Sequence, residues 1–186
     1  MSGCITICPV GLVDEDILNH VTTCIETRCE VACTIGGREQ NPAYAYDEQR
    51  DQYNSMLVLE RLTGCCPPNT MKFIGLTGVD LFIPILKFVF GLSQIDGMCA
   101  VVSSHRLRPE FYGEPPDRAL LLDRIEKTVM HELGHCMTLT HCRDRRCVMY
   151  SSTRIEDTDR KGTDFCPTCA ELFRWHMERI SKISHP

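Results

Sequence analysis

The chain has 186 residues, of which 43% are hydrophobic and 24% are charged, a composition typical of one globular domain with its own core. Its formal net charge of −5 excludes the strongly basic signature of a nucleic-acid-binding domain. The longest apolar stretch, residues 81–92, is too short to cross a membrane, and the N-terminus lacks a secretory signal pattern. We therefore expect a cytoplasmic protein with no membrane association.

The first 107 residues alternate strand-like and helix-like patterns. We expect strands at residues 4–11, 29–35, 71–77, 88–93 and 98–107, because these runs are β-branched or apolar and end at turn residues. Helices are expected at residues 16–26, with Asp14 as the N-cap, and at residues 47–62. This order predicts an α/β (α+β) fold with a mixed sheet packed against helices.

The longest helical pattern follows a polar, proline-rich loop at residues 108–116. Asp117 is the expected N-cap, and apolar residues recur at helical spacing as far as Thr138. Residues 139–186 are polar and rich in cysteine, with a short helix expected at residues 170–180. The sequence therefore predicts one domain, 1–186, with an upper part (1–138) and a lower part (139–186).

Three histidines near the end of this helix form a candidate catalytic metal site. His131 and His135 are four residues apart, which places both imidazoles on one helix face, as two ligands of one zinc ion require. Glu132 is rotated by about 100° from His131, so it is suited to accept a proton rather than to bind the metal. His141 reaches the same ion only if the helix ends and the chain turns back. The alternative, two incidental histidines on a surface helix, is disfavoured by this third histidine.

Four cysteines have the spacing of a structural zinc site, namely Cys142, Cys147, Cys166 and Cys169. Two disulfides or four packed thiols are the alternatives. The polar segment between the two pairs has little apolar content to order it, so a metal cross-link is the favoured interpretation. For the other nine cysteines we favour packed free thiols over disulfides.

The stretch HELGHCMTLTH resembles the metzincin signature HExxHxxGxxH. The following HC-x4-C-x-M and CPTC are similar to the archaemetzincins, a metzincin branch with a second zinc held by four cysteines. The resemblance implies a zincin-like fold, in which a mixed sheet is accompanied by a backing helix and an active-site helix. It further implies a small C-terminal subdomain that is stabilised by a zinc ion. It also implies two zinc ions per chain, Met149 as the Met-turn residue beneath the histidines, and hydrolysis of peptide bonds.

One position departs from the metzincin pattern, because Thr138 occupies the place of the glycine that ends the helix. A positive φ at Thr138 costs about 1–2 kcal/mol, and the alternative is a turn with negative φ. His141 and Cys142 are consecutive, so in an extended segment their side chains face opposite sides. We therefore expect the cysteine site to support the backbone that presents His141.

The sequence predicts a zinc metallopeptidase that acts on peptide or protein substrates, with Glu132 as general base. The alternative is a zinc-stabilised binding protein with little or no peptidase activity, in which the basic loop of residues 143–146 makes a zinc-ribbon-like contact with nucleic acid. Few arginines and a net acidic chain make nucleic-acid binding the weaker hypothesis. The segment Phe88–Gly91 is a candidate edge strand that pairs with an extended peptide.

Overall fold

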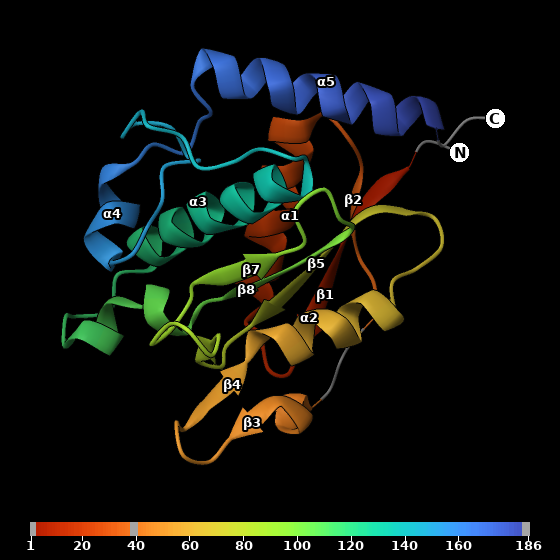
Figure 1. Cartoon of the computed structure of the whole chain (residues 1–186). Coiled ribbons are helices and arrows are strands. Elements are labelled where there is room, and N and C mark those ends of the chain that lie inside the picture. Colours follow the sequence, from red (N-terminus) through yellow and green to blue (C-terminus); the bar gives the residue numbers. More distant parts are fainter. Residues whose placement is uncertain (1–2, 38–40, 184–186) are drawn as a thin grey trace.

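The computed structural model describes residues 3–37 and 41–183, and its centre is a five-stranded sheet (Figure 1). The strand order is β2-β1-β5-β8-β7. Its first four strands run parallel, whereas the edge strand β7 is antiparallel to β8. The strands are β1 (Cys4–Val10), β2 (Cys33–Ile35), β5 (Thr70–Thr77), β7 (Gly91–Ser93) and β8 (Cys99–Ser103).

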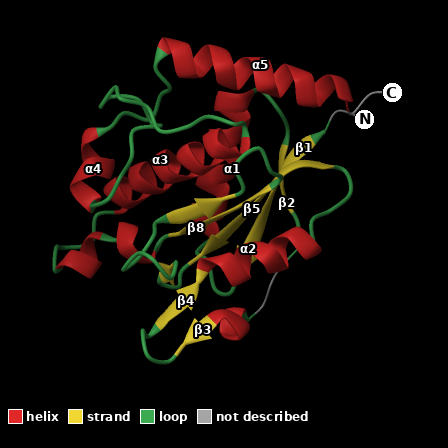
Figure 2. Cartoon of the chain, viewed as in Figure 1, coloured by secondary structure: helices red, strands yellow, loops and turns green. Residues whose placement is uncertain are grey.

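Helices cover both faces of this sheet (Figure 2). Helices α1 (Glu15–Cys29) and α3 (Arg118–Cys136) pack on one face, and α2 (Ser55–Gly64) packs on the other. Adjacent strand residues face opposite sides, so Phe73 joins the cluster under α2 while Ile74 joins the cluster under α1 and α3. Burying such a side chain contributes about 1.5–3 kcal/mol, so the two clusters fix the sheet between its helices. The predicted mixed α/β sheet is confirmed.

Three predicted strands, at residues 29–35, 88–93 and 98–107, are clearly shorter in the structure. Helix α1 continues to Cys29, so β2 begins only at Cys33. In the segment 88–93 only Gly91–Ser93 pairs with β8, while Val89 forms an isolated antiparallel bridge with Leu81. The end of the last predicted strand is instead a 3₁₀ helix at His105–Leu107, followed by another at Pro109–Tyr112.

The predicted helix at residues 47–62 is wrong in its first half. Residues of this half belong to a small sheet made of β3 (Tyr46–Asp47), β4 (Gln52–Asn54) and β6 (Leu81–Phe82), next to a 3₁₀ helix at Pro42–Ala45. The Asp47 carboxylate accepts hydrogen bonds from the backbone N–H groups of Gln49 and Arg50 at 3.0 and 3.1 Å, which favours a turn. Helix α2 begins after Asn54, whose side chain caps it by accepting from Met56 N at 3.0 Å.

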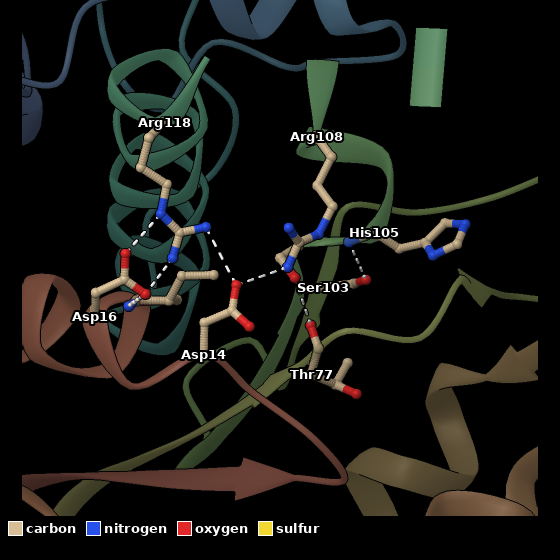
Figure 3. Close-up of polar contacts among 9 residues, drawn as sticks. Asp14, Asp16, Thr77, Ser103, His105, Arg108 and Arg118 are labelled. Carbon is tan, nitrogen blue, oxygen red and sulfur yellow. Dashed lines mark hydrogen bonds and ion pairs between the residues drawn. The ribbon is translucent and has the colours of Figure 1, made fainter. Parts of the chain in front are cut away.

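The starts of α1 and α3 are tied together by ion pairs (Figure 3). Asp14 occupies the N-cap position of α1, as predicted, but its carboxylate binds Arg108 and Arg118 instead of a helix N–H group. These two guanidinium groups lower the pKa of Asp14. Arg118 also binds Asp16. The N-cap of α3 follows the prediction, because the Asp117 side chain accepts from Leu120 N at 2.9 Å.

The C-terminal segment contains α4 (Ile155–Arg160), which the sequence did not predict, and α5 (Pro167–Ile183). Asp157 stabilises the start of α4, since its carboxylate accepts from the N–H groups of Thr153 and Arg154 at 3.0 and 3.1 Å. Helix α5 is longer than predicted and lies across the end of the molecule near α1 and α3 (Figure 1). Within the described ranges, no helix combines the length and apolar character needed to span a membrane.

None of the thirteen cysteines is part of a disulfide; for the nine outside the candidate zinc site we predicted packed thiols. Most of the nine are buried or half-buried, whereas Cys65 is exposed. Burial raises the pKa of the Cys24 and Cys136 thiols to about 12, so both are protonated at neutral pH. These side chains therefore behave as small apolar residues of the core.

Candidate active site

The fold brings His131, His135 and His141 together. His131 and His135 are one turn apart on α3, and His141 follows the end of that helix. The ring centroids of His131 and His135 are 4.7 Å apart, and those of His141 lie 5.2 and 5.0 Å from them. One nitrogen from each ring lies within 4.8 Å of the other two, a distance that a single metal ion can bridge.

Backbone carbonyl groups hold two of these rings in position. The Nδ1 atom of His131 is 2.8 Å from the Val148 carbonyl oxygen, and that of His135 is 2.7 Å from the Leu139 oxygen. Each Nδ1 therefore carries the proton and donates it, which leaves Nε2 as the nitrogen for a metal. Burial lowers the pKa of all three histidines, so the neutral form that binds metal is favoured.

The turn between His135 and His141 is a Schellman motif with Thr138 in the left-handed region at φ 66°. Leu139 N donates to Gly134 O and Thr138 N donates to His135 O, both at 3.0 Å. Of the two geometries expected at Thr138, the structure has the one with positive φ. The Thr138 hydroxyl lies 2.5 Å from Nε2 of His176 on α5, a contact that helps to hold this strained residue.

Glu132 points from α3 toward the edge strand β7. Its carboxylate accepts a hydrogen bond of 2.7 Å from the Ser93 hydroxyl. The side chain is only 7% exposed, and burial raises the pKa of Glu132 to about 7. A divalent cation at the histidines would favour the carboxylate form, so this group is suited to accept and return a proton at neutral pH.

Gly91 allows β7 to approach Glu132 closely. A Cβ atom at this position would lie 2.7 Å from Cγ of Glu132 and 2.9 Å from the Val101 carbonyl oxygen, and both distances are too short. The edge strand can therefore cover the carboxylate only with glycine at this position.

A cleft of about 560 Å³ contains the three histidines and Glu132. One wall is apolar and comes from the segment that leads into and out of β7, including Ile83, Leu86, Phe88, Phe90 and Ile95. A polar part of the lining comes from the chain after Met149, including Ser151, Ser152, Thr153, Thr158 and Lys161. A cleft of this kind can hold a substrate against the histidines.

The four predicted cysteines form a second cluster, whose Sγ atoms lie within 4.8 Å of one another. Backbone N–H groups donate to two of the sulfurs, from Asp144 to Cys142 at 3.4 Å and from Cys166 to Cys147 at 3.2 Å. Burial raises the pKa of the Cys147 thiol, while the hydrogen bond from the Cys166 N–H group acts in the opposite direction. Four thiolates at this separation fit a closed, tetrahedral zinc site.

Met149 lies between the two clusters and is fully buried. Its thioether packs against Gly134, in the turn of α3 that also carries His131 and His135. Its carbonyl oxygen accepts a hydrogen bond of 2.9 Å from Cys142 N. The residue therefore connects the floor of the histidine cluster to the backbone of the cysteine cluster.

The basic loop between Cys142 and Cys147 folds back on itself. The Asp144 carboxylate accepts from Arg146 N at 2.9 Å and lies 3.8 Å from the guanidinium of Arg146. The structure therefore gives this loop a local role in shaping the cysteine cluster, and nucleic-acid binding stays an untested alternative.

Sequence reasoning did not identify Ser93 or Lys161 as parts of the cleft, and it included Gly91 only within the candidate edge strand Phe88–Gly91, without its close approach to Glu132. Only Gly91 carried a local signal, because glycine inside a strand marks a close approach of another group. Ser93 and Lys161 have no motif of their own. Tertiary structure brings them to the histidines from β7 and from the end of α4.

Comparison with known proteins matches residues 18–175 of this chain to peptidase family M54. Archaemetzincin from Methanocaldococcus jannaschii is 40% identical over 167 residues, which cover 89% of each chain. Archaemetzincin from Pyrococcus furiosus is 39% identical over 185 residues, which cover 96% of each chain. The crystal structure of archaemetzincin from Methanopyrus kandleri is similar with a TM-score of 0.82 and 33% identity, covering 94% of this chain and 96% of that one. A zinc-dependent peptidase from Methanocorpusculum labreanum gives a TM-score of 0.83 and 29% identity, covering 91% of this chain and 99% of that one.

Proposed function

The chain belongs to peptidase family M54, the archaemetzincins, and is a zinc metallopeptidase; from this premise we propose that it cleaves peptide bonds with Glu132 as its general base. One observation carries the proposal. A single open cleft contains the three histidines, the buried carboxylate of Glu132 and the edge strand β7. One peptide bound in the cleft could therefore contact the proposed metal site, the proposed general base and the edge strand at the same time.

We propose that the chain holds two zinc ions. His131, His135 and His141 would hold the catalytic ion, because three neutral imidazoles leave one position open. When bound there, zinc lowers the pKa of a water molecule to about 7 and polarises the carbonyl group of the substrate. Cys142, Cys147, Cys166 and Cys169 would hold a structural ion, because four thiolates close the coordination sphere.

In the proposed reaction Glu132 accepts a proton from the attacking water molecule and later donates it to the amine leaving group. The bond from Ser93 fixes the carboxylate, and burial raises the pKa of Glu132 to about 7, which suits both accepting and returning the proton. The outer edge of β7 remains the candidate site for pairing with an extended substrate backbone. Such pairing places a peptide along the histidines.

A peptide library tests this function. Zinc-loaded protein is incubated with mixed peptides, and the products are identified by mass spectrometry. Defined cleavage sites that disappear when a chelator removes the catalytic ion support a peptidase. A fully metallated chain that cleaves no peptide contradicts the proposal and favours a zinc-stabilised binding protein.

Metal analysis tests the proposed stoichiometry. We expect two zinc ions per chain, of which the ion at the histidines leaves first on titration with a chelator, because its site is open. Activity should therefore fall while far-UV circular dichroism is unchanged, and unfolding should follow only at higher chelator concentration. One ion per chain, or simultaneous loss of activity and fold, contradicts the assignment of two separate sites.

Replacing Gly91 with alanine should lower kcat and also decrease stability, because the new methyl group meets the Val101 carbonyl oxygen of β8 as well as Glu132. The new methyl group must displace Glu132, and a misplaced general base costs about a hundredfold in rate. Gly64→Ala is the matched control, since a Cβ atom at Gly64 meets nothing within 4 Å. Steady-state kinetics and thermal unfolding of both variants check this expectation, and equal kcat values for Gly91→Ala and the parent contradict it.

A further inference from the structure

The polar side of the cleft contains a group of buried side chains that the proposed reaction does not use. Thr128, Ser152, Thr158 and Lys161 line the cleft together, and we call these four residues the polar floor. Thr158 is 1% exposed and Lys161 is 3% exposed. Buried polar groups of this kind are normally hydrogen-bonded, so their partners decide what the floor does.

Two hydroxyl groups of the polar floor lack a partner in the described part of the chain. The Ser152 and Thr158 side-chain oxygens are buried and accept or donate no hydrogen bond there. Thr128 differs, because its hydroxyl donates to Arg124 O at 2.8 Å. The floor therefore offers two hydroxyl donors to a ligand.

The Lys161 ammonium group also has N–H donors that are not used in hydrogen bonds within the described part of the chain. It contacts the Tyr150 carbonyl oxygen at 3.2 Å and Nδ1 of His131 at 3.4 Å. That nitrogen donates its own proton to Val148 O, so it cannot accept from Lys161. An ammonium group has three donors, and Tyr150 O satisfies one of them.

The nearby carboxylates of Glu132 and Asp157 interact with the Lys161 charge through space, but their hydrogen bonds go to other groups. Asp157 accepts from Thr153 and Arg154, and the Glu132 oxygen facing Ser93 accepts from that hydroxyl. Among the described residues, the structure records no ion pair for Lys161, in contrast to Lys127, which binds Asp123 at 2.7 Å. A buried cation without a direct ion pair is costly despite these more distant charges, and a hydrogen-bonded anionic ligand group lowers that cost.

We propose that the polar floor binds a carboxylate of the substrate next to the scissile bond, so that the enzyme prefers peptides with Asp or Glu there. This inference rests on the proposed peptidase function. A carboxylate only accepts hydrogen bonds, so it matches the ammonium and both hydroxyl groups at once. The apolar wall of the cleft would take an aliphatic or aromatic side chain of the same peptide. The C-terminal carboxylate of a peptide has the same chemistry as an Asp or Glu side chain, so the experiment must distinguish these two sources.

The test compares octapeptides that are acetylated at the N-terminus and amidated at the C-terminus. They differ only in Glu, Gln or Lys at the positions flanking the cut. We expect kcat/KM for Glu to exceed that for Gln by about tenfold to a hundredfold, the usual effect of hydrogen bonds to a charged group. Matching peptides with a free C-terminus show whether that carboxylate serves instead, and a preference seen only with them would overturn the assignment to a side chain.

Lys161→Met should bring the Glu-to-Gln ratio close to one, and Thr158→Val should reduce it. The ratio is measured within each variant, so a loss of folded or metallated protein cancels. Lys127→Met is the matched control, because it removes a buried lysine that does not line the cleft. An unchanged ratio in Lys161→Met overturns the inference and shows that Lys161 only supports Tyr150 O.

Failure of the inference and failure of the peptidase function give different results. Cleavage without preference for acidic residues leaves the peptidase standing and overturns the inference. If no peptide is cleaved, the Glu and Gln octapeptides are titrated into the protein by calorimetry. Tighter binding of the Glu peptide that depends on Lys161 supports the polar floor, and equal affinities overturn it.

Discussion

Glu132→Gln is expected to lower kcat strongly while the zinc content of the protein stays unchanged. Glutamine has nearly the same shape, and its amide still reaches Ser93, but it cannot accept a proton from water. General bases contribute about a hundredfold to ten-thousandfold to rate, so kcat should fall by that factor. Zinc content is measured alongside the kinetics, because loss of metal would give the same result for another reason.

Ser93→Ala provides a graded comparison for this variant. It removes the bond that fixes the Glu132 carboxylate but leaves the carboxylate in place. We expect a loss of about tenfold in kcat, consistent with one hydrogen bond to a charged group. Activity of Glu132→Gln within tenfold of the parent would rule out Glu132 as the base, and the search would move to another group in the cleft.

Cys142→Ser is expected to remove the structural ion and to weaken zinc binding at the histidines as well. Structural zinc sites contribute roughly 10–16 kcal/mol in apparent binding free energy, which is as large as the net stability of a domain. Cys142 supplies one of the four sulfur atoms of the cluster, and it directly follows His141 in the sequence. Its backbone N–H group is also bonded to Met149 O beneath the histidines, so disorder at one site reaches the other.

Metal content, thermal unfolding and chelator titration of Cys142→Ser measure both effects. We expect fewer than one zinc ion per chain and a large decrease in Tm. Cys65→Ser is the control, because Cys65 is an exposed cysteine outside the cluster. A Cys142→Ser variant that keeps a full, tightly bound ion at the histidines would show that the two sites are independent.

The parts of this protein that the sequence predicted depend on local spacing. His131 and His135 are on one helix face because four residues make one turn, and Asp117 caps the same helix through a bond to Leu120. The mixed sheet followed from the alternation of apolar strands and amphipathic helices. These features need no knowledge of distant contacts.

The errors came from local turns and from tertiary contacts. The apolar spacing around Tyr53 suggested a helix, but Asp47 and Asn54 bind nearby backbone N–H groups and favour a turn and a cap. Helix α4 was missed because its six residues are too few for an apolar period. Ser93 and Lys161 reach the cleft from β7 and from the end of α4, which no local pattern encodes.

The turn at Thr138 has a consequence for how far this active site can be transferred between proteins. In a chain with glycine at that position, the helix ends by itself, and the motif carries its own geometry. Here a β-branched residue adopts φ 66°, and its hydroxyl contacts His176, 38 residues later on α5. Grafting residues 131–142 onto another helix would therefore transfer two histidines in position but leave His141 unplaced. In this protein the position of His141, the proposed third ligand, therefore depends on the C-terminal helix α5 as well as on the motif that contains it.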